Sequence, residues 1–89
     1  MSTISDETLA TPFATEEFRE RLRDLPPSAK LVAKVLEDEA PLSQGQLADA
    51  SLLPDRTVRY ALNRLEDSEL VESRYSFTDA RKQVYFLST

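Results

Sequence analysis

The chain has 89 residues, of which 40% are hydrophobic, and its formal net charge is -5 at pH 7. This length leaves room for one small domain, and the composition is typical of a folded protein rather than a disordered tail. The sequence holds no cysteine and no histidine, which excludes disulfides, thiolate or imidazole metal sites and most nucleophilic active sites. Because Gly45 is the single glycine, glycine-rich phosphate loops are excluded as well. We therefore expect no enzyme, no metal and no cofactor.

Hydropathy and charge also predict the location of the protein in the cell. No apolar run approaches the roughly 18 to 20 residues that span a bilayer, and no export signal begins the chain. We expect a cytoplasmic location and no membrane partner. Sixteen acidic residues stand against only three lysines, a balance that favours a cytoplasm at very high salt, where screening makes negative charge tolerable. Many ordinary proteins are equally acidic, so a halophilic source is one of two interpretations.

In chain order, residues 1–12 are polar and unpatterned, and they predict a flexible leader before a single domain over residues 13–89. A first amphipathic helix is predicted over residues 15–25, because Thr15 is a favourable N-cap and acidic residues fill the first turn. Its apolar residues recur at helical spacing on one face. They are Phe18, Leu22 and Leu25.

A second helix is predicted from Ser28, because the pair Pro26-Pro27 removes amide donors and ends the first helix. Three acidic residues, 37–39, end the polar side of this helix. Acids at a helix C-terminus oppose the macrodipole, so we expect them to be solvated rather than catalytic. Four apolar residues form the stripe that we expect to be buried: Leu31, Val32, Val35 and Leu36.

A short helix and a longer helix follow. Ser43 and Gln46 match a capping box, which predicts a helix over residues 44–51 after a brief extended stretch. A longer helix is predicted over residues 55–68, and together the two helices, across residues 43–68, have the spacing of a helix-turn-helix. We expect the short helix to bury Leu47 and Ala50.

Beyond Glu69 the spacing of hydrophobic residues changes from a period of 3.6 residues to a period of two residues, which predicts two strands within residues 70–88. A polar connection over residues 78–82 predicts the tip of a β-hairpin. Because this tip lacks glycine, we expect Asp79 to take any turn position that needs relaxed backbone geometry. The predicted fold class is mainly α with a small β-hairpin wing, in the order helix, helix, brief strand, helix, helix, strand, strand.

The helix over residues 55–68 has two faces with different chemistry. Guanidinium groups can read guanine or clamp phosphate, an amide can read adenine, and a phenol can reach phosphate or stack on a base. An ordinary solvated helix face is the alternative, but the position on the second helix of a helix-turn-helix favours DNA. The residues predicted to face the core are Val58, Ala61, Leu62 and Leu65. The opposite face carries Arg56, Arg59, Tyr60 and Asn63, flanked by Thr57 and Arg64.

The division of charge along the chain supports the DNA interpretation. Residues 1–54 carry the whole net charge of -5, whereas residues 55–89 carry six acidic and six basic side chains. The segment over residues 55–65 is locally +2, so DNA would accept that face of an acidic protein. Three further cations lie in the predicted wing, where they can reach the neighbouring DNA backbone or minor groove. They are Arg74, Arg81 and Lys82.

Residues 28–88 resemble the winged helix-turn-helix domain of MarR-like and TrmB-like prokaryotic regulators, especially compact archaeal ones. The matching stretches are SAKLVAKVLE, PLSQGQLADASLLPDRTVRYALNRLEDSELVE and YSFTDARKQVYFLS. The resemblance implies binding of double-stranded DNA by the second helix in the major groove, wing contacts beside it, and transcriptional control as a homodimer. Without a long C-terminal helix, the helix over residues 15–25 is the candidate for dimer contacts, and packing within its own domain is the alternative. The candidate contact residues are Phe13, Phe18, Leu22 and Leu25.

Two functions remain open from the sequence. The first is a sequence-specific DNA-binding transcriptional regulator, and the second is a winged helix that binds other proteins within a larger assembly. The charge of -5 favours the second function. The polar outer face of the helix over residues 55–68 favours the first, because interaction modules usually carry apolar residues there. Nothing in the sequence identifies a small-molecule effector.

Overall fold

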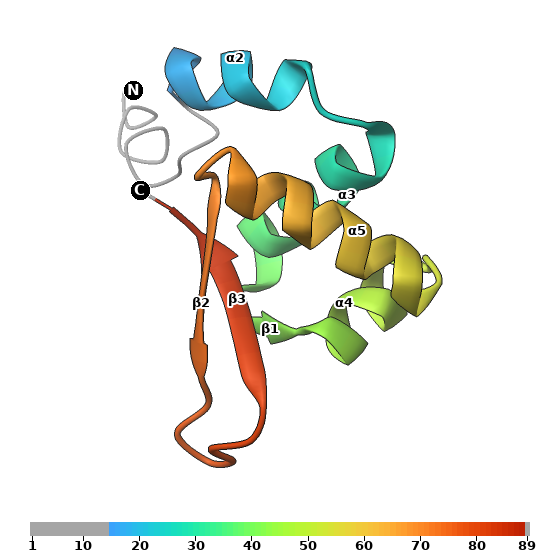
Figure 1. Ribbon diagram of the computed structural model, residues 1–89, viewed down its shortest axis with the longest axis vertical. Coiled ribbons are helices and arrows are strands. Elements are labelled where there is room, and N and C mark those ends of the chain that lie inside the picture. The colour runs from blue at the N-terminus through green and yellow to red at the C-terminus, as the bar shows by residue number, and fades with distance from the viewer. Residues whose placement is uncertain (1–14, 89) are drawn as a thin grey trace, which may run out of the picture.

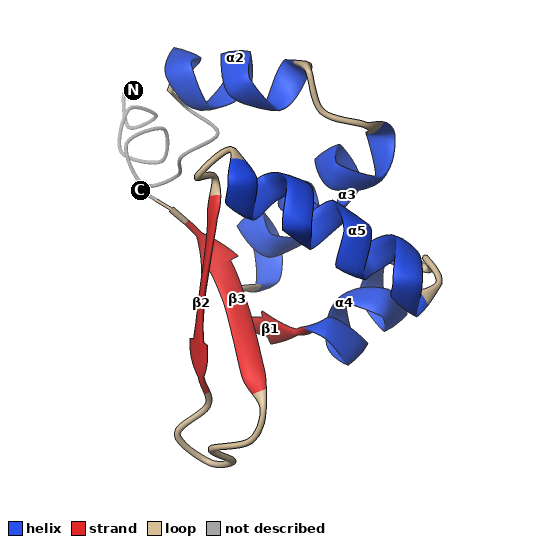
Figure 2. Cartoon of the chain, in the orientation of Figure 1, coloured by secondary structure: helices blue, strands red, loops and turns tan. Residues whose placement is uncertain are grey.

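The computed structural model describes residues 15–88, so the leader expected over residues 1–12 lies outside the described part. In Figure 1, α2 lies at one end of the molecule, α3, α4 and α5 pack together, and the β2–β3 hairpin projects from the other end. The predicted fold class, mainly helical with a small hairpin wing, is confirmed (Figure 2). The elements are α2 (Glu16–Arg23), α3 (Pro27–Glu39), β1 (Leu42–Ser43), α4 (Gln44–Ser51), α5 (Asp55–Asp67), β2 (Val71–Tyr75) and β3 (Gln83–Leu87).

The three strands form one antiparallel sheet in the order β1-β3-β2. β2 pairs with one edge of β3, with Val71 opposite Leu87. β1 pairs with the other edge, with Leu42 opposite Tyr85. The sequence predicts only a brief extended stretch before α4. The pairing of β1 with β3 connects the base of the wing to the start of the helix-turn-helix.

Local signals explain where α2 and α3 begin and end. Thr15 is the N-cap of α2, and its side-chain oxygen accepts a hydrogen bond from the Phe18 N–H at 3.3 Å. α2 ends at Arg23, two residues before the predicted end. Pro26 is the N-cap of α3 and Pro27 is its first residue, where a missing amide donor removes no helical hydrogen bond.

The predicted capping box at the start of α4 is confirmed. The Gln46 N–H donates to Ser43 Oγ at 3.2 Å, and the Ser43 N–H donates to Gln46 Oε1 at 2.9 Å. These two bonds satisfy amides that have no partner inside the helix. They fix the direction in which α4 leaves β1.

Two non-glycine residues of the described chain, Leu52 and Glu69, adopt a left-handed backbone with φ of 63° and 61°. Leu52 ends α4 in the turn to α5, and Glu69 lies between α5 and β2. The expectation that Asp79 takes such a position is wrong. At the wing tip the Asp79 carboxylate accepts a hydrogen bond from the Arg81 N–H at 3.0 Å, in a turn that needs no positive φ.

One hydrophobic core joins the helices to the base of the sheet. Two burial predictions are wrong. Leu31 is 40% exposed because the buried face of α3 consists of Ala29, Val32, Ala33 and Leu36. Ala50 is exposed, whereas the neighbouring Ser51 is buried. None of the helices within residues 15–88 combines the length and apolar character needed to cross a bilayer. The core residues contributed by α5 are the predicted ones: Val58, Ala61, Leu62 and Leu65.

Candidate nucleic-acid interface

α5 separates its side chains into a buried face and an exposed face. The apolar face packs against α3 and α4, which holds the helix and turns the opposite face into solvent. We call this second surface the outer face of α5, and it consists of Arg56, Arg59, Tyr60 and Asn63, all exposed. The flanking residues predicted with them, Thr57 and Arg64, are half-buried.

Carboxylates of the described chain do not neutralise the outer face of α5. The ion pairs found within residues 15–88 lie on α2, on α3 and at the wing tip. Arg64 Nη1 donates a hydrogen bond to the Tyr60 hydroxyl at 2.9 Å, and its guanidinium carbon lies 5.8 Å from the ring centroid. Tyr60 stays 48% exposed. Within the described part of the chain, the donors of Arg56 and Arg59 therefore have no carboxylate partner.

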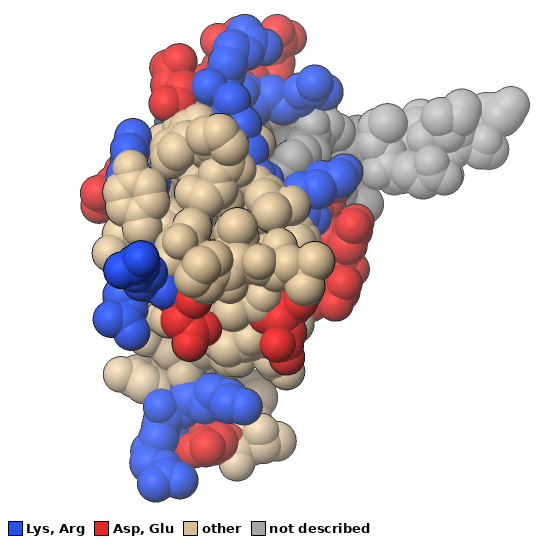
Figure 3. Space-filling view, turned by 90° about the vertical axis from the view of Figure 1, so that its right-hand side faces the viewer, with Lys and Arg blue, Asp and Glu red and all other residues tan. Residues whose placement is uncertain are grey.

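Basic side chains are concentrated in the segment over residues 55–65 and at the wing tip of a chain whose net charge is negative. In Figure 3, Lys and Arg side chains lie along the left-hand edge and around the wing tip, while at the top of the molecule they are mixed with Asp and Glu side chains. The acidic excess lies in the first part of the sequence, where residues 1–54 carry the whole net charge of -5. An anionic duplex can therefore meet a locally positive surface on an acidic protein.

The two cations at the wing tip, Arg81 and Lys82, are both exposed. Arg81 Nε lies 3.5 Å from Asp79 Oδ1, yet the Arg81 side chain remains 92% exposed. An exposed pair of this kind contributes little energy, so it does not prevent Arg81 from contacting another anion.

Arg74 is separated from the other predicted contacts. Its guanidinium carbon lies 5.5 Å from the centroid of the Phe86 ring. Side chains alternate between the two faces of a strand, so Arg74 lies on the opposite face of the hairpin from Val71 and Tyr85, which pack against the core. The structure thus gathers the outer face of α5 but leaves Arg74 on the far side of the wing.

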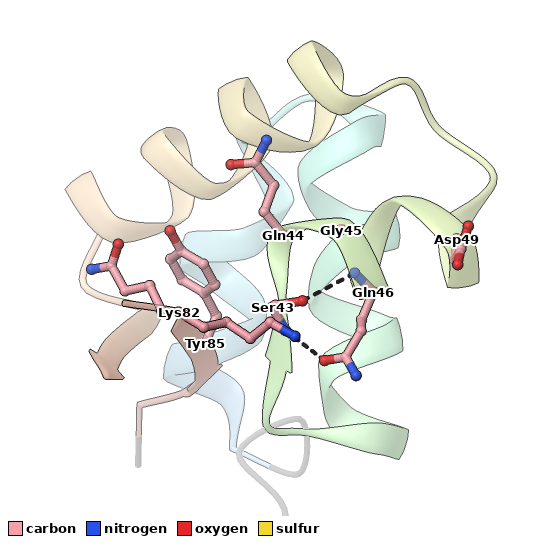
Figure 4. A pocket seen from close by; sticks show the side chains of 8 residues that line it. Ser43, Gln44, Gly45, Gln46, Asp49, Lys82 and Tyr85 are labelled. Atoms are coloured by element: carbon pink, nitrogen blue, oxygen red, sulfur yellow. Dashed lines mark hydrogen bonds between the residues drawn. The ribbon is translucent and has the colours of Figure 1, made fainter. Parts of the chain in front are cut away.

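Tyr85 connects the wing to α5. Its side chain is half-buried on β3, and its hydroxyl points toward α5 in Figure 4. Burial raises the pKa of the Tyr85 phenol, the nearby charge of Glu66 raises it further, and the charge of Arg59 lowers it. Sequence reasoning missed this residue, because only the register of the sheet brings it near α5.

An open groove of about 580 Å³ lies between the first turn of α4 and the wing (Figure 4). Gly45 adds no side chain to it, and a Cβ at this position would meet no atom within 4 Å. Gln44 Nε2 donates to the Asp55 carbonyl oxygen at 3.4 Å, which joins the starts of α4 and α5. Within residues 15–88 no three acidic side chains gather in a metal-binding group. The groove is lined by Ser43, Gln44, Gly45, Gln46, Asp49, Lys82, Gln83 and Tyr85.

The apolar residues of α2 and of the loop that follows it pack within their own domain. Phe18, Leu22 and Leu25 are 6–8% exposed and belong to the hydrophobic core of the chain. This burial favours the alternative, packing on the domain's own helices, while the dimer contacts stay a prediction. Phe13, the fourth residue of that expectation, lies outside the described residues.

Solved structures share this fold. The chain is similar to Bordetella bronchiseptica BpsR, whose structure concerns regulation of DNA binding by 6-hydroxynicotinic acid, with 23% identity and a TM-score of 0.71 over 80% of this chain and 52% of that one. It is also similar to S. aureus MepR in a complex with DNA, with 23% identity and a TM-score of 0.68 over 96% of this chain and 61% of that one. A third similar structure is the MarR family transcription regulator SP03579, with 21% identity and a TM-score of 0.70 over 79% and 47%. The chain thus spans about half the length of BpsR and SP03579.

No curated protein matches the chain. A family model described as MarR family matches residues 23–82, which is more than half of the sequence. The matched segment contains α3, both helices of the helix-turn-helix and the first strand and tip of the wing. The chain therefore belongs to the MarR family, the family of transcription regulators whose winged-helix fold it shares.

Proposed function

We propose that this chain binds double-stranded DNA in a sequence-specific manner and regulates transcription. In this proposal α5 enters the major groove while the wing contacts the backbone or the minor groove beside it. The observation that carries the proposal is the outer face of α5. Its side chains are exposed, have the chemistry that reads bases, and form no ion pair within residues 15–88. A protein-interaction module is disfavoured because this face is polar.

Each side chain of the interface has a role that follows from its chemistry. Arg59 and Asn63 are one turn apart on the same face, and we assign base reading to them, with Arg on guanine and Asn on adenine. Arg56 lies in the first turn of α5 and can reach bases or phosphate. The remaining predicted contacts bind phosphate or sugar: Thr57, Tyr60, Arg64, Arg81 and Lys82.

The comparisons support a DNA partner. The structure of S. aureus MepR contains DNA, and that of Bordetella bronchiseptica BpsR concerns the regulation of DNA binding. We propose that two copies of this chain bind as a homodimer to half-sites about one helical turn apart, in the cytoplasm. Sedimentation of the free chain and of its DNA complex measures the number of copies directly.

The proposal is tested by titrating variants against a DNA site selected from a random pool. Arg59→Ala and Asn63→Ala should each weaken binding by about 1–3 kcal/mol and relax the base preference at one position. Arg81→Ala should weaken binding to all sequences alike, because phosphate contacts carry no sequence information.

Arg23→Ala is the matched control, since Arg23 is an exposed arginine on α2 that pairs with Glu20 at 3.4 Å. It should bind as the wild-type chain does. If Arg59→Ala and Asn63→Ala also bind like the wild type, the outer face of α5 does not contact DNA and the proposal is wrong.

A further inference from the structure

The wing tip presents an aromatic ring to solvent. Phe77 is 98% exposed, more than any other large hydrophobic side chain of the described residues. Folding gains nothing from this ring, because it is as accessible in the folded chain as in an unfolded one. A ring of this size becomes favourable when a partner removes it from water.

Hydrogen bonds hold the loop that carries Phe77 in one shape. The Ser76 N–H donates to the Lys82 carbonyl oxygen at 2.8 Å, and the Lys82 N–H donates to the Asp79 carbonyl oxygen at 2.9 Å. The Thr78 N–H donates to Ser76 Oγ at 3.2 Å, and the two hydroxyls of these residues lie 3.0 Å apart. Both neighbours of Phe77 are therefore fixed. A loop backbone held in advance loses little conformational freedom on binding.

The position of the loop suggests what covers the ring. The exposed cations Arg81 and Lys82 lie on the same loop, and the hydroxyl of Tyr85 on β3 points toward α5, the helix that carries Arg59 (Figure 4). A five-residue strand extends about 17 Å, which is about half of the 34–36 Å helical repeat of DNA. Half a repeat is the distance from a major groove to the neighbouring minor groove. With α5 in the major groove, the wing is long enough to bring its tip to the minor groove.

We propose that Phe77 enters the minor groove next to the major groove that α5 occupies, an inference that rests on the proposed function. The ring packs on the sugar walls of the groove, while Arg81 and Lys82 contact the phosphates on either side. Apolar side chains are used in this way by proteins that bind the minor groove. Contact between the wing tips of two copies is disfavoured because both are cationic, and contact of the ring with another face of a second copy is an outcome of the test.

The test uses the full chain and the DNA site selected for it, measured by fluorescence anisotropy. Phe77→Ala should weaken binding about tenfold or more, and Phe77→Leu should weaken it less. Both variants should unfold at the wild-type temperature, since the ring is exposed. Leu31→Ala, which removes an exposed apolar side chain from α3, is the matched control and should bind normally.

A second measurement identifies the groove. Exchange of guanine for inosine removes an amino group from the minor groove and leaves the major-groove pattern of the base pair unchanged. Placed half a helical turn outside the α5 site, this exchange should change the affinity of the wild-type chain and leave that of Phe77→Ala unchanged.

The outcomes separate this inference from the proposed function. If Phe77→Ala binds like the wild type while Arg59→Ala loses affinity, the minor-groove contact is wrong and DNA binding by α5 stands. If neither variant changes binding, both proposals fail. If Phe77→Ala alters the sedimentation of the free chain and responds to inosine as the wild type does, the ring contacts a second copy and the inference is overturned.

Discussion

Leu52 has a backbone conformation that a leucine disfavours. Its φ of 63° is left-handed, and its side chain is 89% exposed, so packing does not compensate. A left-handed residue with a Cβ costs about 1–2 kcal/mol, most of which glycine avoids. Leu52→Gly should therefore raise the free energy of unfolding by about 1 kcal/mol in urea titrations. The neighbouring Leu53 packs against the core, so Leu53→Gly should lower it, and the same sign for both variants would refute this account.

Tyr85 makes the stability of the fold depend on pH in the alkaline range. Burial and the charge of Glu66 raise the pKa of its phenol above the ordinary value of 10.0, which the unfolded chain retains. The stabilisation that comes from this shift is therefore fully present below the ordinary pKa of the phenol. It is lost as the pH rises from that pKa toward the pKa in the folded chain, because the unfolded state loses the proton first. The urea midpoint should drop between about pH 9 and 11, and Tyr85→Phe should flatten that drop. An equal drop in the variant would exclude Tyr85 as the cause.

Residue positions on a helix could be predicted wherever the periodicity was unambiguous. The outer face of α5 lies where the sequence predicts it, because apolar and polar residues alternate there at helical spacing. Leu31 was ambiguous, since both Leu31 with Val35 and Val32 with Leu36 are spaced by four residues. Only the packing of α3 decides between the two pairs. The exposure of Phe77 could not be predicted from periodicity, because Phe77 lies in the loop of the wing and not on a helix or strand.

At the scale of elements, the capping box determines where α4 begins. Ser43 is buried and its hydroxyl accepts the Gln46 N–H at 3.2 Å. Ser43→Ala should lower the free energy of unfolding by about 1 kcal/mol, because it leaves that amide without its acceptor. The measurement is a urea titration with Ser68→Ala as the control. Ser68 is the C-cap of α5 and contributes its backbone rather than its side chain, so an equal loss in both variants would argue against the cap.

The elements themselves were largely predictable from the sequence, but their pairing was not. Caps and periodicity are local signals, and they gave each helix within about two residues of its observed ends. The hydrogen bonds between β1 and β3 join segments far apart in the chain, with Leu42 opposite Tyr85. No local pattern records such a pairing. The groove beside Gly45 depends on it, because residues of β1 and of β3 line that groove, which is why the sequence could not predict it.

At the scale of the whole molecule, the number of phosphate contacts predicts a steep dependence of DNA binding on salt. Each phosphate contact contributes a slope of about -0.9 to the logarithm of the binding constant against the logarithm of salt concentration, so about four contacts give a slope near -3.6. Lys82→Ala should make the slope less negative by about 0.9. Lys34→Ala is the control, because Lys34 pairs with Glu37 at 2.7 Å on α3, and it should leave the slope unchanged. A slope that is the same in all three chains would contradict a phosphate contact by the wing.

The central claim is that an acidic chain of -5 net charge recognises DNA through the locally basic outer face of α5. Selection of bound sequences from a random DNA pool, performed at low and at molar KCl, tests it most directly. The account predicts enrichment of one palindromic consensus, with half-sites about one helical turn apart, that is lost for the double variant Arg59→Ala and Asn63→Ala. The absence of any enriched sequence at either salt concentration would contradict it.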